Sequence, residues 1–405
     1  MKITIIGGGI VGMAFALQCH RRGIECDVYE AAPEIRELGV GITLLPHATR
    51  ELALLGLGDK IEALGIENRE SRFYNRFGQL IYNEPRGRFA GYESPERGVH
   101  RGQLHMCLYE AAREVLSERI HKGFKCVAVE QNEDQAVAHF IDPDSGESRG
   151  TVTADLLIGC DGVNSTVRRH FYPGDEVVFT GINTWRGTTR RKPILDGQTY
   201  LRVGSIRTGK MVIYPIIDDI DGSGDQLINW MAEIETANVS RNDWNQKGNI
   251  DDFLPIYRDW TFDWLNVREL IESADQILEY PMVDKDPVKQ WTFGRITFAG
   301  DAAHPMYPRG SNGSAQGLID ARVLADFLAS RSPVDALKAY EDERLEKTGK
   351  IVETNRSHPP DFINIRIEEL TGDKPFDNLD DFISQDELKE MSDKYKAIAG
   401  FSLKS

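Results

Sequence analysis

The sequence predicts an α/β fold in which a Rossmann-like dinucleotide-binding domain carries an inserted, mainly antiparallel β-sheet domain and continues into a C-terminal helical tail. A glycine-rich turn follows the apolar strand at residues 3–6, and a Gly-Asp pair follows a second apolar strand at residues 296–299. Between about residues 173 and 285 the pattern changes to alternating strands, which are typical of an antiparallel sheet. The chain is therefore expected to leave the nucleotide domain and return to it.

The first turn has the spacing of a nucleotide-binding loop. Gly7 permits a tight turn, Gly9 lets the backbone approach a pyrophosphate, and Gly12 packs the helix against the strand. After that helix we expect a second strand at residues 26–29, which ends in Glu30. A carboxylate at the tip of this strand accepts hydrogen bonds from ribose hydroxyls and repels the extra phosphate of NADP.

The same segment has an alternative interpretation as a secretory signal, because Lys2 precedes a mostly apolar stretch that runs to Leu17. The stretch lacks a small-x-small cleavage site, and Glu30 would then be a coincidence. The nucleotide-binding interpretation is favoured.

The remaining elements follow from hydrophobic periodicity and from turn residues. In chain order we expect a helix that opens at residues 99–104, strands at 126–129 and 154–160, alternating strands at 211–215 and 227–231, a loop at 302–313, a helix with apolar residues from 318 to 327, and a helical tail beyond 360 with a capping box at Ser384 and Glu387.

Composition excludes several classes of function. With 405 residues the chain is expected to fold as two or more packed units. Its 48 basic and 64 acidic side chains leave a net charge of −16, which disfavours binding to nucleic acid or to anionic lipid. No run of about 18 apolar residues is present, so no membrane span is expected.

Cysteine and histidine patterns give no sign of a disulfide framework or of a metal site. The five cysteines lack a Cys-x-x-Cys pair and are expected to be buried thiols in a reducing, cytoplasmic environment. The nine histidines lack the spacing of metal ligands, so no metal is predicted. The sequence also lacks a Gly-x-Ser-x-Gly elbow and a Walker-type lysine.

Three glycine–acid motifs together resemble one known family. They are the glycine loop with Glu30, Cys160-Asp161-Gly162, and residues 300–305 with Pro308 and Gly313. As a set they resemble the class A flavin-dependent aromatic hydroxylases, the p-hydroxybenzoate hydroxylase fold family, over roughly residues 1–350. Residues 184–187, 280–287 and 300–317 look closest to the phenazine hydroxylases of that family.

The resemblance implies a set of FAD-binding residues. Gly7, Gly9 and Gly12 would hold the pyrophosphate, and Glu30 the adenosine ribose. Asp301 would accept a hydrogen bond from a ribitol hydroxyl. A helix that starts near Ser314 would point its positive end at the flavin N1. The other implied cofactor-binding residues are Thr43, Arg101, Cys126, Asn312 and Gly313, together with Asp161, whose motif is linked in the family to both FAD and the nicotinamide cofactor.

The resemblance also implies a domain division. The predicted FAD-binding domain is discontinuous and comprises residues 1–70, 96–172 and 286–350. The predicted substrate-binding β-sheet domain comprises residues 71–95 and 173–285, and residues 351–405 form the C-terminal helical segment, which could cover the domain interface or mediate dimerisation.

The implied activity is hydroxylation of an electron-rich aromatic or N-heteroaromatic molecule by an FAD monooxygenase that uses NAD(P)H and O2 through a flavin C4a-hydroperoxide. Only one dinucleotide motif is present, so NADH or NADPH would bind transiently. Lys210 or Arg186 could bind a substrate carboxylate or phenolate, and Pro308 could form a wall at the flavin face. The protein would act as a monomer or a homodimer on a small aromatic substrate.

Other interpretations remain open at this point. Lys210 and Arg186 could equally be solvated, since lysine at a strand edge often is. The chain could instead be another FAD oxidoreductase without oxygen insertion, or a non-catalytic flavin-binding module. Structural alternatives also remain for the polar residues: Arg101 could pair with a surface acid, Asp161 could be a turn residue, and Asp301 could cap a helix. His304 is expected to be a structural hydrogen-bonder, because no acid is visibly paired with it. Among the apolar residues, Pro305, Met306 and Pro308 could only shape their loop, and Trp185 and Trp230 could lie in the sheet core.

Overall fold

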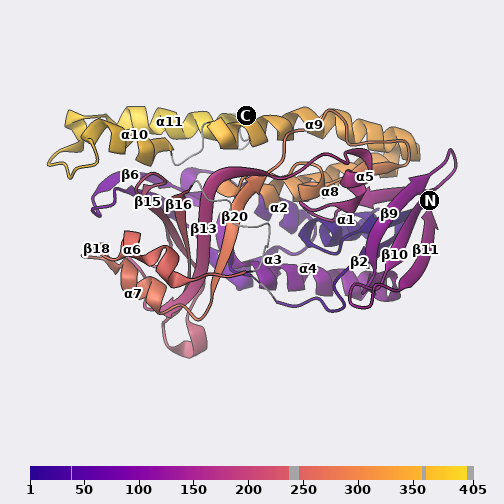
Figure 1. Ribbon diagram of the computed structural model, residues 1–405, viewed down its shortest axis with the longest axis horizontal. Helices are drawn as coiled ribbons and strands as arrows, with labels where there is room; N and C mark the ends of the chain where they lie inside the picture. Colours follow the sequence, from indigo (N-terminus) through magenta and orange to yellow (C-terminus); the bar gives the residue numbers. More distant parts are fainter. Residues whose placement is uncertain (38, 237–245, 358–361, 399–405) are drawn as a thin grey trace.

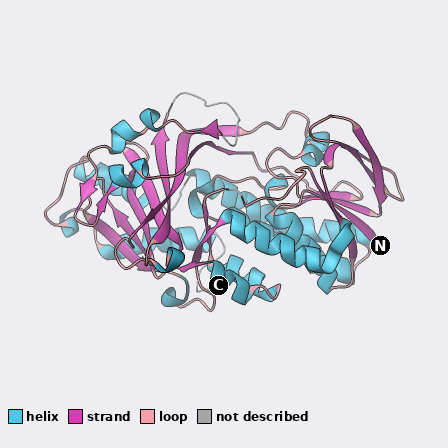
Figure 2. Ribbon diagram, turned by 90° about the horizontal axis from the view of Figure 1, so that it is seen from below, coloured by secondary structure: helices cyan, strands magenta, loops and turns pink. Residues whose placement is uncertain are grey.

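A computed structural model describes residues 1–37, 39–236, 246–357 and 362–398. A parallel sheet with its helices and a larger, mainly antiparallel sheet lie side by side, and the C-terminal helices run along one side of both (Figure 1). Figure 2 shows long helices lying between the large sheet and the strands near the N-terminus. The architecture confirms the predicted fold class.

The five-stranded sheet is parallel and has the order β21-β12-β1-β2-β8. Its central strand β1 pairs in register with β2 on one side and with β12 on the other. Consecutive residues of β1, Ile3, Thr4, Ile5 and Ile6, are all buried, as expected of a strand that is covered on both faces. The strands are β1 (Lys2–Ile6), β2 (Glu25–Glu30), β8 (Ile120–Lys122), β12 (Leu156–Gly159) and β21 (Ile296–Phe298).

Helices from distant parts of the sequence cover this sheet. α1 and α8 approach each other closely because Gly300 and Gly317 leave room for Val11, whose side chain would lie 2.8 and 2.4 Å from a Cβ at those two positions. The start of α1 is thereby held beside the start of α8. The helices are α1 (Ile10–Arg21), α4 (Arg101–Leu116), α5 (Thr166–Phe171), α8 (Gly313–Ser330) and α9 (Pro333–Ser357).

Two three-stranded sheets and two short helices complete this half of the molecule. The sheet β3-β7-β4 contacts the large sheet. The sheet β11-β10-β9 lies beside the N-terminus (Figure 1). The elements are β3 (Gly41–Leu44), β4 (Gly65–Glu67), β7 (Arg97–His100), β9 (Lys125–Gln131), β10 (Ala136–Ile141), β11 (Ser148–Ala154), α2 (Pro46–Leu54) and α3 (Gly58–Leu64).

The large sheet has eight strands in the order β17-β20-β13-β16-β15-β14-β5-β6. All neighbours pair antiparallel except β14 and β5, which are parallel. The strands are β5 (Glu70–Tyr74), β6 (Leu80–Pro85), β13 (Val178–Arg191), β14 (Thr199–Ser205), β15 (Gly209–Ile217), β16 (Gln226–Glu235), β17 (Gln246–Lys247) and β20 (Ile277–Asp284).

The two faces of the large sheet have different environments. On one face, which we call the core face, Trp185 and Trp230 are buried, and Trp185 stacks on Phe253. Both tryptophans are therefore sheet core. The expectation of strands alone between residues 173 and 285 was incomplete, because the core face is covered by α6 (Leu254–Tyr257), α7 (Val267–Glu272) and the hairpin of β18 (Thr261–Phe262) with β19 (Leu265–Asn266).

The described part of the tail consists of α10 (Phe362–Thr371) and α11 (Gln385–Ile398). The capping box is confirmed, since the Ser384 N–H donates to Glu387 Oε2 at 3.0 Å and the Glu387 N–H donates to Ser384 Oγ at 3.3 Å. Ile363, Ile367 and Leu388 pack against Phe73 and Tyr82 of the large sheet. The predicted start of the tail at Pro359-Pro360 lies outside the described residues.

Candidate functional site

The glycine loop between β1 and α1 forms an open cradle at a helix N-terminus. The Gly7 N–H donates to the Tyr29 carbonyl at 2.8 Å, and with φ of 101° a Cβ on Gly7 would lie 2.4 Å from the Cys160 carbonyl oxygen. A Cβ on Gly9 would meet nothing within 4 Å. α1 has no side-chain cap and no acid in its first turn. Its first N–H groups can therefore bind an anion.

Glu30 lies at the end of β2, where its carboxylate reaches back to the glycine loop. Oε2 accepts a hydrogen bond from the Gly8 N–H at 2.6 Å, and Oε1 accepts one from the Ala32 N–H at 2.7 Å. Each carboxylate oxygen keeps further acceptor capacity, so Glu30 can also accept hydrogen bonds from the two hydroxyls of a ribose. His105 of α4, which the sequence did not single out, contacts the Gly8 carbonyl oxygen through Nε2 at 2.7 Å.

The motif at Gly300 and Asp301 places an exposed carboxylate near an exposed cation. Asp301 follows β21, and within the described residues its carboxylate accepts no hydrogen bond. Partial removal of water from the Asp301 carboxyl by neighbouring atoms raises its pKa, while the charges of His304 and Arg101 act to lower it. Arg101 has no ion pair among the described side chains, which contradicts pairing with a surface acid.

α8 starts beside this carboxylate. A Cβ on Gly313 would lie 3.8 Å from Asp301 Oδ1. Asn312 holds the N-cap position without a side-chain cap bond, and the first turn contains no acid. The alternative that Asp301 caps this helix is therefore not supported. Asn312, Gly313 and Ser314 present the start of α8 next to Asp301, so the second uncapped helix N-terminus of the site lies close to the first.

Asp161 has a local structural role. Its Oδ2 accepts hydrogen bonds from the Thr166 N–H at 2.7 Å and the Val167 N–H at 3.2 Å, and Ser165 Oγ donates to Oδ1, so Asp161 holds the start of α5. Burial and the Asp161 charge raise the pKa of the Cys126 thiol to about 12. The cofactor contacts of Asp161, Cys126 and Thr43 remain predictions.

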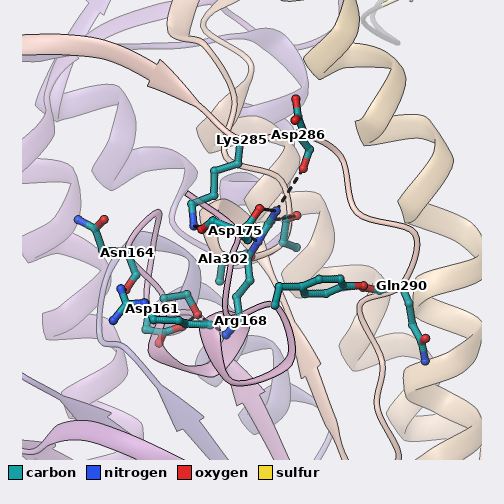
Figure 3. A network of polar contacts seen from close by, with 12 residues as sticks. Asp161, Asn164, Arg168, Asp175, Lys285, Asp286, Gln290 and Ala302 are labelled. Atoms are coloured by element: carbon teal, nitrogen blue, oxygen red, sulfur yellow. Dashed lines mark hydrogen bonds and ion pairs between the residues drawn. The ribbon is translucent and has the colours of Figure 1, made fainter. Parts of the chain in front are cut away.

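Arg168 connects the Asp-Gly motif to the loop after Asp301 (Figure 3). Its side chain is 1% exposed, pairs with Asp175 at 2.7 Å, and donates to the carbonyl oxygens of Ala302 at 3.2 Å and Ala303 at 2.8 Å. Lys285 shares Asp175 at 2.8 Å. The sequence did not single out Arg168, because its side-chain partners other than Asp175 lie on segments more than 100 residues away.

His304 does have an acidic partner, which corrects the reasoning from the sequence. His304 Nε2 lies 2.5 Å from Asp320 Oδ2, and Arg344 Nε donates to Asp320 Oδ1 at 2.8 Å. All three side chains are buried. The acid was not recognisable because it lies 16 residues away on the next helix. The buried network supports a structural role for His304.

The face of the large sheet opposite the core face turns toward the nucleotide domain, and we call it the inner face. Asn229 Oδ1 accepts a hydrogen bond from the Gly41 N–H at 2.7 Å. At the other end of this face, Tyr307 packs against Ile182 and Met282. The centre of the inner face therefore lies between β3 and the loop that leads into α8.

The two predicted anion-binding residues lie on the inner face in different environments. Lys210 is 3% exposed and Glu233 is 2% exposed, and Lys210 Nζ lies 2.7 Å from Glu233 Oε2. The alternative of a solvated Lys210 is therefore wrong. Arg186 is half-buried, with its guanidinium 5.5 Å from the centre of the Tyr280 ring.

Two polar atoms at the centre of the inner face have no hydrogen-bond partner in the described part of the chain. Arg186 Nε and Thr184 Oγ1 are both buried and make no hydrogen bond to the described residues. Thr184 is fully buried, and it lies opposite Tyr280 on β20 and opposite Glu233 on β16. A ligand with a polar substituent could satisfy both atoms.

The loop before α8 has one exposed corner. Pro308 is exposed at the start of a 3₁₀ turn, Pro308–Gly310, and its place at the flavin face remains a prediction. Met306 packs against Ile351 and Val352 of α9. Met306 therefore shapes the loop.

The other expectations concern cysteines, metals and membranes. All five cysteines are buried and unpaired. Among the residues with described positions, no group of His, Cys, Asp and Glu side chains could hold a metal ion. None of the helices in the described ranges is long and apolar enough to span a membrane.

Comparisons with known proteins agree on one family. The family model described as an FAD binding domain matches residues 1–182 and 274–355, which is more than half of the chain. Phenazine 1,6-dicarboxylic acid hydroxylase PhzS of Lysobacter antibioticus is 40% identical over 361 residues, covering 87% of this chain and 89% of that protein. 3-Amino-4-hydroxybenzoate 2-monooxygenase PtmB3 of Streptomyces platensis is 31% identical over 370 residues, covering 89% and 88% of the two chains. A solved structure of a HpxO variant from Klebsiella pneumoniae complexed with FAD has a TM-score of 0.81 at 21% identity and covers 100% of both chains.

Proposed function

Because this chain belongs to the FAD binding domain family and is an FAD-dependent aromatic monooxygenase, we propose that its substrate is a planar N-heteroaromatic acid whose carboxylate binds Arg186. The observation that carries this proposal is the half-buried Arg186 at the centre of the inner face, with an aromatic neighbour and a buried Nε that has no partner in the described chain.

The site geometry suits FAD at both ends of the cofactor. We propose that the N-terminus of α1 holds the pyrophosphate and that Glu30 holds the adenosine ribose. Asp301 and Arg101 would contact the middle of the cofactor. The N–H groups at the start of α8 would face the flavin ring, where the positive helix end stabilises negative charge. When bound, FAD supplies the redox chemistry between NAD(P)H, O2 and the substrate.

The inner face would position the aromatic ring opposite the flavin. Arg186 offers a planar fork of donors that matches a carboxylate, and Thr184 offers a hydroxyl to a second polar substituent. The names of the two relatives support an acid, because each names an aromatic carboxylic acid or a benzoate as the substrate of that protein. An electron-rich ring is required because oxygen is transferred as an electrophile.

Replacing Arg186 by methionine is expected to raise the KM for a carboxylated substrate about 10- to 100-fold, because a charge-assisted hydrogen bond is lost. Since the interaction holds the substrate equally in the ground and transition states, kcat should change little. Arg186→Lys should give an intermediate KM, because it keeps the charge without the planar fork. Steady-state kinetics on matched acid and decarboxylated substrates would measure these effects.

Arg202 is the matched control for this prediction. It lies in the same row of the inner face, but its guanidinium already donates to Ser71 and lies 4.8 Å from the centre of the Phe73 ring. Arg202→Met should leave the ratio of acid to decarboxylated KM unchanged. An equal loss of affinity for both substrates in Arg186→Met would contradict the proposed carboxylate contact.

The activity is tested by NAD(P)H consumption across phenazine, pyridine, quinolone and phenolic acids, with mass spectrometry for the gain of one oxygen. We expect a stimulated rate and a hydroxylated product with at least one N-heteroaromatic acid. Turnover of phenolic acids without turnover of any N-heteroaromatic acid would contradict the proposed substrate class.

A further inference from the structure

Tyr395 of the C-terminal helix α11 contacts the loop that leads into α8. Asn312 Nδ2 donates to the Tyr395 hydroxyl at 2.9 Å, and that hydroxyl donates to Asn355 Oδ1 of α9 at 3.0 Å. Asn355 in turn donates through Nδ2 to the Tyr307 carbonyl oxygen at 3.0 Å. Asn312 is 1% exposed and Asn355 is fully buried. One hydrogen-bonded chain therefore holds both ends of the segment from Tyr307 to Asn312.

The loop is shaped to receive this tyrosine. A Cβ on Gly310 would lie 1.5 Å from the Tyr395 hydroxyl, so no other residue type at that position leaves room for the ring where it lies. The ring also packs against Leu45, which directly precedes α2. The hydroxyl thus reaches Asn312 through a gap that exists only because residue 310 is glycine.

Asn312 has a second neighbour in α2. His47 is buried beside it, and burial lowers the pKa of the His47 imidazole to about 4, although the hydrogen bond with Asn312 acts in the opposite direction. His47 is therefore neutral at physiological pH. The Asn312 side chain therefore has two polar neighbours, the His47 imidazole and the Tyr395 hydroxyl.

α11 is attached independently to the large sheet. Ser392 Oγ and Lys396 Nζ both donate to Glu84 Oε2 of β6, at 2.6 and 2.7 Å. Ser392, Tyr395 and Lys396 have the spacing of a single helix face. The face of α11 that contacts the large sheet through Glu84 therefore also carries the Tyr395 hydroxyl that binds Asn312. Figure 1 shows α11 running along the large sheet toward the helices of the nucleotide domain.

We propose that Tyr395 is a positioning residue for the cofactor, which holds Asn312 so that the N–H groups at the start of α8 stay directed at the flavin. This inference rests on the proposed placement of FAD at Asn312 and Gly313. The C-terminal helix then links the sheet that binds the substrate to the loop that binds the flavin. Because Tyr395 acts through Asn312, its loss should change the properties of the bound flavin.

Tyr395→Phe removes the hydroxyl and keeps the ring in its pocket. We expect FAD to bind about fivefold more weakly, which is the loss of one ordinary buried hydrogen bond. The reduction potential of the bound flavin should also shift, because the positive end of α8 is less well directed. FAD affinity is measured by titration of apoprotein and followed by flavin fluorescence, and the potential is measured by dye-coupled reduction.

Ser392→Ala is the matched control, since it loosens α11 on the same helix face without a contact to Asn312. It should lower the melting temperature of the apoprotein and leave FAD affinity and flavin potential unchanged. Equal flavin effects in both variants would show that the tail acts only by stabilising the fold, which overturns the proposal. Unchanged affinity and potential in Tyr395→Phe would overturn it as well.

A double-mutant cycle tests whether Tyr395 acts through Asn312. In an Asn312→Ala background, Tyr395→Phe should cause little further loss of FAD affinity, because the two residues share one interaction. Additive losses would overturn the proposed route. A Gly313→Leu variant would place a side chain in the space proposed for the flavin, since a Cβ on Gly313 has no neighbour closer than 3.8 Å, and it should lose FAD affinity. Wild-type FAD affinity in that variant would refute the placement of the cofactor, so the two failures are distinguishable without any substrate.

Discussion

Replacing Lys210 by methionine is expected to destabilise the protein by about 3–5 kcal/mol, because the substitution leaves the buried Glu233 carboxylate without its partner. Both side chains are nearly inaccessible to water, and their charged atoms lie 2.7 Å apart. A buried charge that loses its counterion keeps the cost of dehydration without the compensating attraction. Thermal unfolding of the apoprotein would measure the loss as a lower melting temperature.

Removing both charges should reverse most of this loss. In Lys210→Met combined with Glu233→Leu, side chains of similar volume fill the same space and no uncompensated charge remains. Lys192→Met is the control for a surface pair, since the Lys192 side chain is 72% exposed beside Asp225 and its loss should barely change the melting temperature. A single Lys210 variant as stable as the wild type would contradict the prediction.

The double variant also decides whether Lys210 binds the substrate. The single variant cannot show this, because a raised KM could follow from a disturbed inner face. If Lys210 contributes its charge to a substrate anion, the KM of the double variant for the carboxylated substrate should rise while its FAD content stays normal. An unchanged KM in the double variant would leave Arg186 as the anchor.

Asp320→Asn is expected to cost a similar amount, about 3–5 kcal/mol, because the carboxylate of Asp320 balances two buried cationic or donor groups. Its oxygens accept hydrogen bonds from Arg344 Nε at 2.8 Å and the Gly300 N–H at 3.0 Å, and contact His304. An amide of the same shape cannot neutralise Arg344. Since Gly300 directly precedes Asp301, weaker FAD binding should accompany the lower melting temperature.

The same carboxylate makes part of the stability dependent on pH. Burial acts to raise the pKa of Asp320, but His304 and Arg344 outweigh it and lower the pKa from 3.8 to about 2. A lowered pKa means that the contribution is fully present above the unfolded pKa and is lost as the pH falls toward the folded one. The stability difference between wild type and Asp320→Asn should therefore narrow by about 1 kcal/mol between pH 6 and pH 3.

Asp326→Asn on the same helix provides the comparison. The Asp326 side chain is 48% exposed and pairs with Arg22 and Arg322 at the surface, so its loss should change stability by less than about 1 kcal/mol. Equal losses of stability in Asp320→Asn and Asp326→Asn would mean that the buried network around Asp320 stabilises the protein no more than a surface ion pair does. A stability difference for Asp320 that stays constant down to pH 3 would contradict the proposed titration.

Much of the cofactor-binding half could be predicted from the sequence, because its signals are local. Gly7, Gly9 and Gly12 follow directly on an apolar strand, and the turn geometry they permit depends on adjacent residues only. The capping box at Ser384 was recognisable for the same reason. The helices between residues 250 and 272 were missed because short helices that cover a sheet lack a strong period of their own.

The partners of the polar side chains depend on contacts between distant segments. Lys210 and Arg186 were equivalent candidates as cations near strands, and only the register of β13, β15 and β16 shows that Glu233 faces Lys210. In the structure His304 contacts Asp320, and Asn312 forms a hydrogen bond with Tyr395, which lies 83 residues further along the chain.

By itself, the sequence determined the fold class, the nucleotide loop with Glu30, and the return of the chain at Asp301, since backbone conformation and hydrophobic periodicity are encoded by neighbouring residues. The tertiary structure alone decided which charges are neutralised inside the protein and which remain available to a ligand. Electrostatic balance in a buried site depends on distances between side chains, and those distances follow from strand register and helix packing rather than from spacing along the chain.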